Sequence, residues 1–336
     1  MFLEKSYRIG EVLVLKILVG RPYGSLLTDV SEWKKFAEIE YAESQDEASL
    51  IKQIVDADVL AVGSVPVTSE IIEAGKKLKM IQTFSVGYEN IDVEAATKAG
   101  IMVCNTGGVN AESVAELAWG LILGLARQIP GGDRLMREGK WGRFMSEKHV
   151  LVFGKTLGIV GFGAIGRIAG KIGRLAFNMN LLAYDPFVTS ETIESFGGTL
   201  VSLEKLMKES DVISLHVPLS VDTRHMIGER ELRMMKPSAV IVNTSRGAVI
   251  DEEALTRALQ DNVIGGAGLD VFENEPLSAE SPLRKMDNVI IVSHIGSCPE
   301  ALTKMNIVGV DNVLRFVRAE MPMRIVNPRY IIALAI

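Results

Sequence analysis

The stretch from Gly154 to Asp185 constrains the fold more than any other part of the chain. It contains a short β-branched strand, the turn Gly161-x-Gly163-x-x-Gly166, a segment with apolar residues at helical spacing, and a second apolar strand. In such a turn the first glycine bends the chain, the second lets the backbone approach a pyrophosphate, and the third brings helix and strand together. The free N–H groups and positive dipole end of the helix favour that pyrophosphate. The pattern therefore predicts a dinucleotide-binding βαβ unit.

Asp185, the last residue of this stretch, indicates which dinucleotide binds. It follows Gly166 by about 20 residues, the spacing expected for the acid that binds the adenosine ribose hydroxyls. A carboxylate at this position would repel the 2′-phosphate of NADP, so the sequence favours NAD as the cofactor.

Short apolar runs alternate with helical patterns on both sides of the motif. Before it, strands are expected at 12–19, 37–41, 59–62, 80–84 and 101–104, and helices at 30–36, 47–55, 69–74 and 93–98. After it, strands are expected at 212–217, 239–243, 266–270 and 289–292, and helices at 229–235, 252–260 and 300–318. This alternation predicts an α/β protein with two doubly wound, Rossmann-like parallel-sheet domains.

The segment between the two predicted domains has two parts. Residues 105–110 have the composition of a turn, and apolar residues then recur at helical spacing from Asn110 to about Gln128. Residues 129–153 show no such period and carry Trp141 and Phe144 among charged residues. We expect this irregular segment to be either a loop on its own domain or an arm buried against a second subunit.

Composition excludes several classes of partner. The 336 residues carry a net charge of −6 with no long basic run, so no nucleic-acid partner is expected. No apolar run approaches the ~20 residues of a membrane span, so no membrane partner is expected. Cys104 and Cys298 have no metal-site spacing and are expected to be reduced thiols of a cytoplasmic protein without a metal.

Four residues whose side chains could take part in a reaction stand at or after predicted strands of the second domain. Arg246, Asp270 and His294 follow or close apolar runs, and Glu275 comes shortly after Asp270. Ligands of open α/β sheets bind outside the carboxyl ends of the strands. Each of these residues alone is more commonly structural, but together with a hydride-carrying cofactor they suggest a mechanism.

Reduction of a 2-keto acid would use this set of residues. Arginine has a planar fork that suits the substrate carboxylate and polarises the carbonyl. Histidine is the acid suited to neutral pH, and it could supply a proton as hydride arrives. A glutamate near His294 would favour the charged imidazolium and orient the ring.

Eight segments in order resemble the D-2-hydroxyacid dehydrogenase family, which includes phosphoglycerate dehydrogenases and glyoxylate/hydroxypyruvate reductases. The resemblance extends from about Val59 to Asn327. The segments are SVGYENID (85–92), NTGGVNAESVAE (105–116), GKTLGIVGFGAIG (154–166), YDP (184–186), LHVPLSVDTRHMI (215–227), NTSRGAVID (243–251), GLDVFENEP (268–276) and SHIGS (293–297).

The resemblance implies roles for individual residues. It implies Arg246 as the substrate clamp, Glu275 as the acid partner, His294 as the proton donor, and the backbone at Val86 and Gly87 as a substrate-carboxylate contact. The expected cofactor contacts are Gly161, Gly163, Ala164, Ile165, Gly166, Asp185, Pro218, Thr223, Thr244, Asp270 and Gly296. It also implies a homodimer and a discontinuous substrate-binding domain (1–104 and 297–336) of flavodoxin-like fold around an NAD-binding domain (105–296).

Several alternatives remain at this stage. KWGRF at 140–144 and the YDP segment resemble phosphoglycerate dehydrogenases, and TFSVGYENID at 83–92 resembles glyoxylate reductases, so the substrate stays open. The segment after the third strand, 63–66, carries no arginine for a substrate phosphate. Two other dehydrogenase classes are disfavoured. An L-lactate-type enzyme would carry its glycine motif near the N-terminus, whereas here the motif begins at Gly161. Formate oxidation needs no acid–histidine pair for proton transfer. An NAD(H)-sensing scaffold that resembles the C-terminal-binding co-repressors is the alternative outside enzymes.

Overall fold

The computed structural model describes residues 15–20, 30–44, 46–63, 65–141 and 150–329. The chain forms two compact units. The first unit comprises Met1–Asn110 and Pro299–Ile336, and the second comprises Ala111–Cys298. These bounds lie a few residues from the expected ones at 104/105 and 296/297. The assignment of substrate binding to the first unit stays a prediction.

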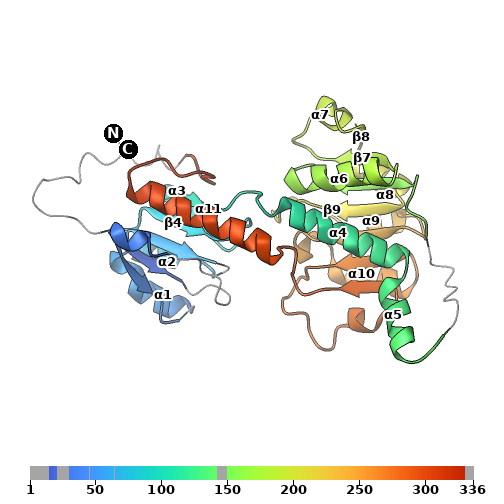
Figure 1. Ribbon diagram of the computed structural model, residues 1–336, viewed down its shortest axis with the longest axis horizontal. Coiled ribbons are helices and arrows are strands. Elements are labelled where there is room, and N and C mark those ends of the chain that lie inside the picture. Colours follow the sequence, from blue (N-terminus) through green and yellow to red (C-terminus); the bar gives the residue numbers. More distant parts are fainter. Residues whose placement is uncertain (1–14, 21–29, 45, 64, 142–149, 330–336) are drawn as a thin grey trace, which may run out of the picture. The chain divides into compact units, whose positions relative to one another are not determined.

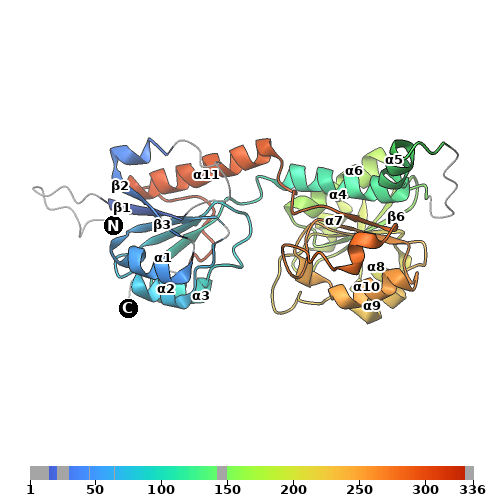
Figure 2. The same ribbon diagram turned by 90° about the horizontal axis from the view of Figure 1, so that it is seen from below.

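The first unit contains a five-stranded parallel sheet in the order β2-β1-β3-β4-β5. Its strands are β1 (Leu15–Val19), β2 (Ala37–Tyr41), β3 (Val59–Val62), β4 (Met80–Thr83) and β5 (Met102–Cys104). Helices α1 (Glu47–Gln53), α2 (Ser69–Ala74) and α3 (Val93–Lys98) cover one face, and α11 (Pro299–Val317) covers the other (Figure 2). This is the flavodoxin-like order, as the family resemblance implied.

Side-chain caps fix where the three short helices of this unit begin. Asp46, Thr68 and Asp92 each precede a helix and accept a hydrogen bond from a backbone N–H in its first turn. Such a cap satisfies one of the helix's unpaired donors. Helix α11 returns from the far end of the sequence because its apolar face packs on β4 and its neighbours.

The second unit contains a seven-stranded parallel sheet in the order β12-β11-β10-β9-β6-β7-β8. Its strands are β6 (Thr156–Val160), β7 (Asn180–Tyr184), β8 (Gly198–Leu200), β9 (Val212–Leu215), β10 (Val240–Asn243), β11 (Gly266–Leu269) and β12 (Val289–Ile291). Helices α4 (Ala111–Ala126) and α6 (Ala164–Ala176) cover one face, and α8 (Leu203–Glu209), α9 (Glu229–Met234) and α10 (Glu252–Gln260) cover the other (Figures 1 and 2). The strand order reverses between β6 and β9, and open α/β sheets bind ligands outside the carboxyl ends of the strands at such a point.

Close packing joins α4 and α6 to this sheet. The indole of Trp119 on α4 donates a hydrogen bond to the carbonyl of Ala169 on α6 over 3.0 Å, and its ring stacks on Phe177. A Cβ atom at Gly173 would lie 2.5 Å from the Leu157 side chain and 3.0 Å from Trp119, so a larger residue there would force these side chains to shift. Helix α4 therefore helps to hold α6, the helix of the glycine motif, against β6.

The prediction of an irregular 129–153 segment was wrong for its first part. Ile129–Arg137 forms helix α5, which begins after Gln128 in the left-handed region and has Pro130 in its first turn. The sequence Pro130-Gly131-Gly132 near its start is typical of a turn, which is why the helix was not predicted. Phe144 lies outside the described residues. Among the described helices, none is long and apolar enough to cross a lipid bilayer.

Two other parts of the fold differ from the sequence prediction. The helix expected at 30–36 is only the 3-10 turn Trp33–Lys35, held by burial of Trp33. Between Asp185 and β9 the chain forms α7 (Ser190–Glu194), β8 and α8, which the sequence analysis did not assign. Polar residues and the Gly197-Gly198 pair weaken the periodic signal there, whereas Ser202 caps α8 through its hydroxyl.

Candidate active site

The glycine turn has the geometry that its three glycines predict. Gly161 has φ +91°, and a Cβ there would lie 2.7 Å from the carbonyl oxygen of His216 at the end of β9. A Cβ at Gly166 would lie 2.1 Å from the carbonyl oxygen of Gly161. At Gly163, by contrast, a Cβ would meet no atom within 4 Å. The turn is thus packed tightly against the sheet but open on the side of Gly163.

Asp185 is fixed beside this turn at the end of β7. Its Oδ2 accepts a hydrogen bond from the N–H of Phe162 over 2.8 Å, and its Oδ1 accepts one from the N–H of Phe187 over 2.8 Å. Each oxygen keeps a lone pair, so the carboxylate can still accept hydrogen bonds from two ribose hydroxyls. The Nε of Arg167 donates to the carbonyl of Phe162, which directs this cation back to the turn.

The other expected cofactor residues lie on the carboxyl ends of neighbouring strands. After β9, the Thr223 hydroxyl donates to the carbonyl of Pro218 over 2.6 Å and closes that loop. After β10, the hydroxyl oxygen of Thr244 is buried and has no hydrogen-bond partner within the described residues. Ala164 and Ile165 form the first turn of α6, which begins without a side-chain cap. Three features are consistent with a dinucleotide bound at these strand ends. Helix α6 begins without a side-chain cap, Gly163 leaves open space, and the buried Thr244 hydroxyl has no hydrogen-bond partner within the described residues.

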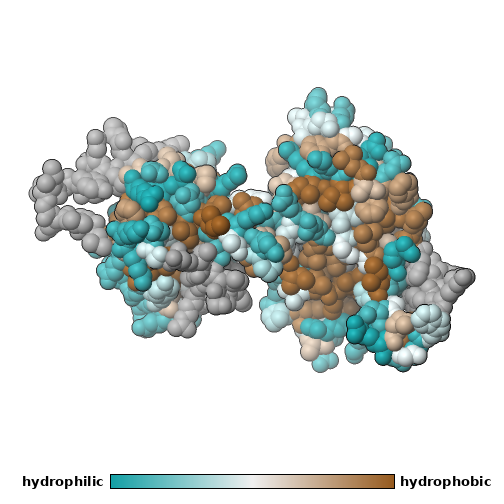
Figure 3. Space-filling view, in the orientation of Figure 1, coloured by the Kyte–Doolittle hydropathy of each residue, from teal (hydrophilic) through white to brown (hydrophobic). Residues whose placement is uncertain are grey.

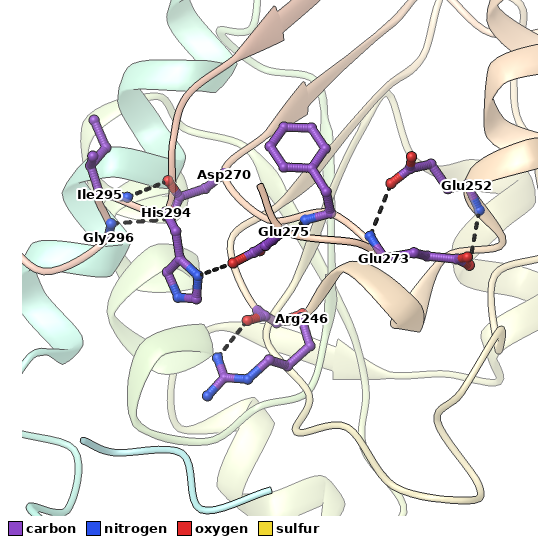
Figure 4. A network of polar contacts seen from close by, with 10 residues as sticks. Arg246, Glu252, Asp270, Glu273, Glu275, His294, Ile295 and Gly296 are labelled. Atoms are coloured by element: carbon purple, nitrogen blue, oxygen red, sulfur yellow. Dashed lines mark hydrogen bonds and ion pairs between the residues drawn. The ribbon is translucent and has the colours of Figure 1, made fainter. Parts of the chain in front are cut away.

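His294 and Glu275 meet in the second unit as the sequence analysis required (Figure 4). The Nδ1 of His294 lies 2.8 Å from Oε2 of Glu275, and the Oε1 of the same carboxylate accepts the N–H of Phe272 over 3.0 Å. The imidazole side chain is 50% exposed, so its second nitrogen, Nε2, can reach a ligand. This arrangement leaves Nε2 to carry a transferable proton.

The pair also tunes its own proton affinities. The hydrogen bond to Glu275, and then the charge of that carboxylate, raise the pKa of His294 above its usual value, although burial and Arg246 oppose the shift. Burial opposes ionisation of Glu275, but hydrogen bonds from His294 and the Phe272 N–H, with the nearby charges, lower its pKa overall. The imidazolium–carboxylate form is therefore stabilised near neutral pH.

Arg246 lies beside this pair at the start of the turn after β10 (Figure 4). Its Nη1 donates to the carbonyl of Ser245 over 2.7 Å, and its own carbonyl accepts from the Asn243 side chain. A Cβ at Gly247 would fall 1.8 Å from the carbonyl carbon of Phe272. The turn that carries Arg246 therefore packs directly against the backbone of the segment that carries Glu275.

Asp270 fixes the backbone on the other side of His294. Its carbonyl accepts the His294 N–H, and its carboxylate accepts the N–H groups of Ile295 over 2.7 Å and Gly296 over 3.0 Å. These bonds hold His294 at φ +54°. Burial raises the pKa of Asp270, against the effect of these donors and of His294.

The remaining described histidines differ from His294. Burial lowers the pKa of His216 to about 4, so this ring is neutral at neutral pH, and its Nε2 lies 2.9 Å from the Ser214 hydroxyl. The Nε2 of His225 lies 2.5 Å from Oε1 of Glu273, two residues before Glu275. His149 lies outside the described residues.

The expected substrate contact belongs to the first unit. Val86 and Gly87 follow β4 in a half-buried loop, in which the Ser85 hydroxyl donates to the carbonyl of Gly87. The side chain of Asn105 donates to the carbonyl of Val86 over 2.7 Å. The N–H groups of this loop are consistent with a carboxylate contact, and that role stays a prediction.

Two supporting residues were missed by the sequence analysis. The Ser113 hydroxyl donates to the carbonyl of Gly296 and accepts the Cys298 N–H, so it braces the backbone just after His294. Glu273 pairs with His225 and lies in the same short segment as Glu275. The alternation Glu273-Asn274-Glu275 was the available signal, but sequence alone does not show which glutamate faces which histidine.

Comparisons with known proteins agree with this geometry. The family described as D-isomer specific 2-hydroxyacid dehydrogenase, NAD binding domain, matches residues 119–296. A glyoxylate reductase of Thermococcus litoralis is 44% identical over 305 residues, which cover 88% of this chain and 92% of that protein. A D-3-phosphoglycerate dehydrogenase of Methanocaldococcus jannaschii is 42% identical over 94% of this chain but only 60% of its own length. The crystal structure of a glyoxylate reductase from Paecilomyes thermophila superposes with a TM-score of 0.86 at 32% identity, covering 94% of this chain and 98% of that one.

Together with the Rossmann fold, these comparisons show an oxidoreductase that acts on the CH–OH group of its donor. The chain belongs to the D-isomer specific 2-hydroxyacid dehydrogenase family. It is an NAD-dependent D-2-hydroxyacid dehydrogenase, as the sequence analysis predicted.

Proposed function

We propose that the protein reduces a small, unphosphorylated 2-keto acid of the glyoxylate or hydroxypyruvate type with NADH. When bound, NADH supplies the hydride. Arg246 holds the substrate carboxylate and polarises the carbonyl, while the Nε2 of His294 donates a proton to the carbonyl oxygen. Glu275 keeps His294 protonated and oriented. The contact of 2.8 Å between His294 and Glu275, beside Arg246, carries this proposal.

The choice of an unphosphorylated substrate rests on the loop after β3. The segment Gly63-Ser64-Val65-Pro66 contains no basic residue. Of its described residues, Gly63 and Val65 direct their carbonyls to the side-chain amide of Asn90, which offers no cation to a substrate phosphate. A phosphate monoester would have to be bound by charge-assisted hydrogen bonds elsewhere.

A matched pair of substrates tests this choice. Hydroxypyruvate and its 3-phosphate differ only in the phosphate group, so the ratio of kcat/KM with NADH isolates recognition of that group. We expect hydroxypyruvate and glyoxylate to be better substrates than the phosphate ester. A clear preference for the ester would assign the 3-phosphoglycerate reaction instead. No turnover with any 2-keto acid, with tight NADH binding, would favour the NAD(H)-sensing scaffold.

An exposed apolar surface supports a homodimer. Large hydrophobic side chains are exposed on α5, on the segment that follows, and at the end of α6, and Figure 3 shows hydrophobic surface over α4 and α6. These residues are Ile129, Met136, Trp141, Leu151, Phe153 and Leu175. Apolar patches of this kind mark protein interfaces. Both cysteines are free thiols, which agrees with a cytoplasmic location.

Light scattering tests the homodimer. The wild-type protein should have twice the mass of one chain at micromolar concentration, and Leu151→Arg should shift it toward the monomer. Val221→Arg is a matched control because Val221 is equally apolar and 95% exposed in the loop after β9. A wild-type monomer, or a Leu151→Arg variant that stays dimeric, would contradict this interface.

A further inference from the structure

A second polar cluster lies next to the His294–Glu275 pair and has no part in the chemistry described above. It consists of His225 from the loop before α9, Glu252 at the start of α10, and Glu273 from the loop after β11. The Nε2 of His225 lies 2.5 Å from Oε1 of Glu273. Glu252 and Glu273 each accept the other's backbone N–H, at 3.0 and 3.3 Å (Figure 4). The three residues thus join two separate loops and the start of α10 in the second unit.

Each member of the cluster is itself held in place. The N–H of His225 donates to the carbonyl of Ala248 over 2.8 Å, and two residues further on Ile227 and Ile250 form an isolated parallel bridge. His225 adopts φ +52°, in the left-handed region. The carboxylate of Glu273 meets the first N–H of α10, where the helix dipole favours a negative charge.

The cluster connects to Glu275 through two adjacent peptide groups. The N–H of Glu273 donates to Glu252, and the preceding N–H, of Phe272, donates to Oε1 of Glu275. The segment 271–277 has no helix or strand, so these contacts decide its conformation. Glu275 therefore depends on the anchored backbone of Glu273 for its position against His294.

We propose that His225, Glu252 and Glu273 are positioning residues that hold the Phe272–Glu275 segment so that Glu275 meets His294. None of the three touches the reacting atoms. This inference rests on the proposed roles of His294 and Glu275. It predicts that loosening the cluster changes the proton affinity of His294, because Glu275, Arg246 and Asp270 are the charged groups that act on that imidazole.

The test compares pH profiles of 2-keto acid reduction. Reduction needs protonated His294, so its upper pH limit reports the pKa of that residue. In Glu273→Ala and His225→Ala, Glu275 should shift away from His294, and the upper limit should move down by about 1 pH unit. The kcat should fall ~10-fold with an unchanged KM for NADH, since small misplacements of catalytic groups are costly.

Two kinds of control separate positioning from general destabilisation. His225→Gln and Glu273→Gln keep a donor or an acceptor at the same place, and both should recover most of the wild-type pH limit. Glu253→Ala removes another 2.5 Å ion pair, to Arg257 on the exposed side of the same helix α10, and should leave the pH limit unchanged.

The outcomes are distinguishable. If Glu273→Ala and His225→Ala lower the melting temperature but keep the wild-type pH limit, the cluster is merely structural and the inference is overturned. If His294→Ala and Glu275→Gln themselves leave kcat and the pH limit unchanged, the proposed function of the pair fails, whatever the cluster does.

Discussion

Two histidine–glutamate pairs flank one short segment of the second unit, and they differ in what surrounds them. His294 and Glu275 meet at the carboxyl end of β12, beside Arg246 and the buried Asp270, with half of the imidazole exposed. The pair of His225 and Glu273 lies beside the N–H groups of α10 and the loop before α9. The chemical groups are the same, but only the first pair includes a residue, His294, that follows the last strand of the sheet, β12.

This difference in position is the reason to propose a catalytic role for the His294–Glu275 pair and not for the His225–Glu273 pair. The carboxyl end of a parallel strand faces the crevice in which ligands bind, and a cation there can hold a carboxylate substrate. The hydrogen-bonding partners of the His225–Glu273 pair are backbone groups of neighbouring loops and of α10. The following predictions test how far the two pairs differ, from the largest expected effect to the smallest.

His294→Ala should produce the largest loss. Removing the proton donor should reduce kcat by ~10²–10⁴, because a positioned acid contributes about that much to the rate. His225→Ala should reduce kcat far less, since His225 acts only on the position of Glu275. Steady-state kinetics with NADH and glyoxylate measure both. Equal losses in the two variants would remove the distinction between the pairs.

Arg246→Ala should cause the second-largest loss of activity, because Arg246 lies beside the His294–Glu275 pair and not beside the His225–Glu273 pair. The variant should raise KM for the keto acid and lower kcat together, since the clamp acts in both the ground and the transition state. Arg246→Lys keeps the charge but loses the planar fork, and should recover only part of the activity. An unchanged KM for the keto acid in Arg246→Ala would exclude Arg246 as the clamp.

The two pairs should behave alike toward the cofactor. Neither pair contacts the glycine turn, so His294→Ala and His225→Ala should bind NADH with nearly wild-type affinity.

Asp185→Ala should weaken NADH binding by ~10-fold and reduce the preference for NADH over NADPH. The variant lacks the carboxylate that contacts the ribose and that repels the 2′-phosphate. Fluorescence titration with both cofactors checks this. Equal affinities of the wild-type protein for NADH and NADPH would refute the role of Asp185.

Much of this arrangement was predictable from sequence, and the failures have physical reasons. The glycine turn, the acid after β7, Arg246 and His294 follow strands with a clear apolar pattern, so their positions at strand ends could be predicted from the sequence. Helix α5 was missed because Pro130, Gly131 and Gly132 near its start are typical of a turn. The His225–Glu273 pair was missed because it joins segments 48 residues apart through loops, for which no local pattern exists.

The pH dependence of Glu275→Gln tests the central claim most directly. Glu275 raises the pKa of His294, so its loss should lower that pKa. Reduction needs the protonated imidazole, and its upper pH limit should therefore move to lower pH in the variant. Oxidation of the 2-hydroxy acid needs the neutral imidazole, so its lower pH limit should move down as well. Both limits moving down together is the predicted result, whereas limits identical to those of the wild-type enzyme would contradict a His294–Glu275 pair that sets the catalytic proton.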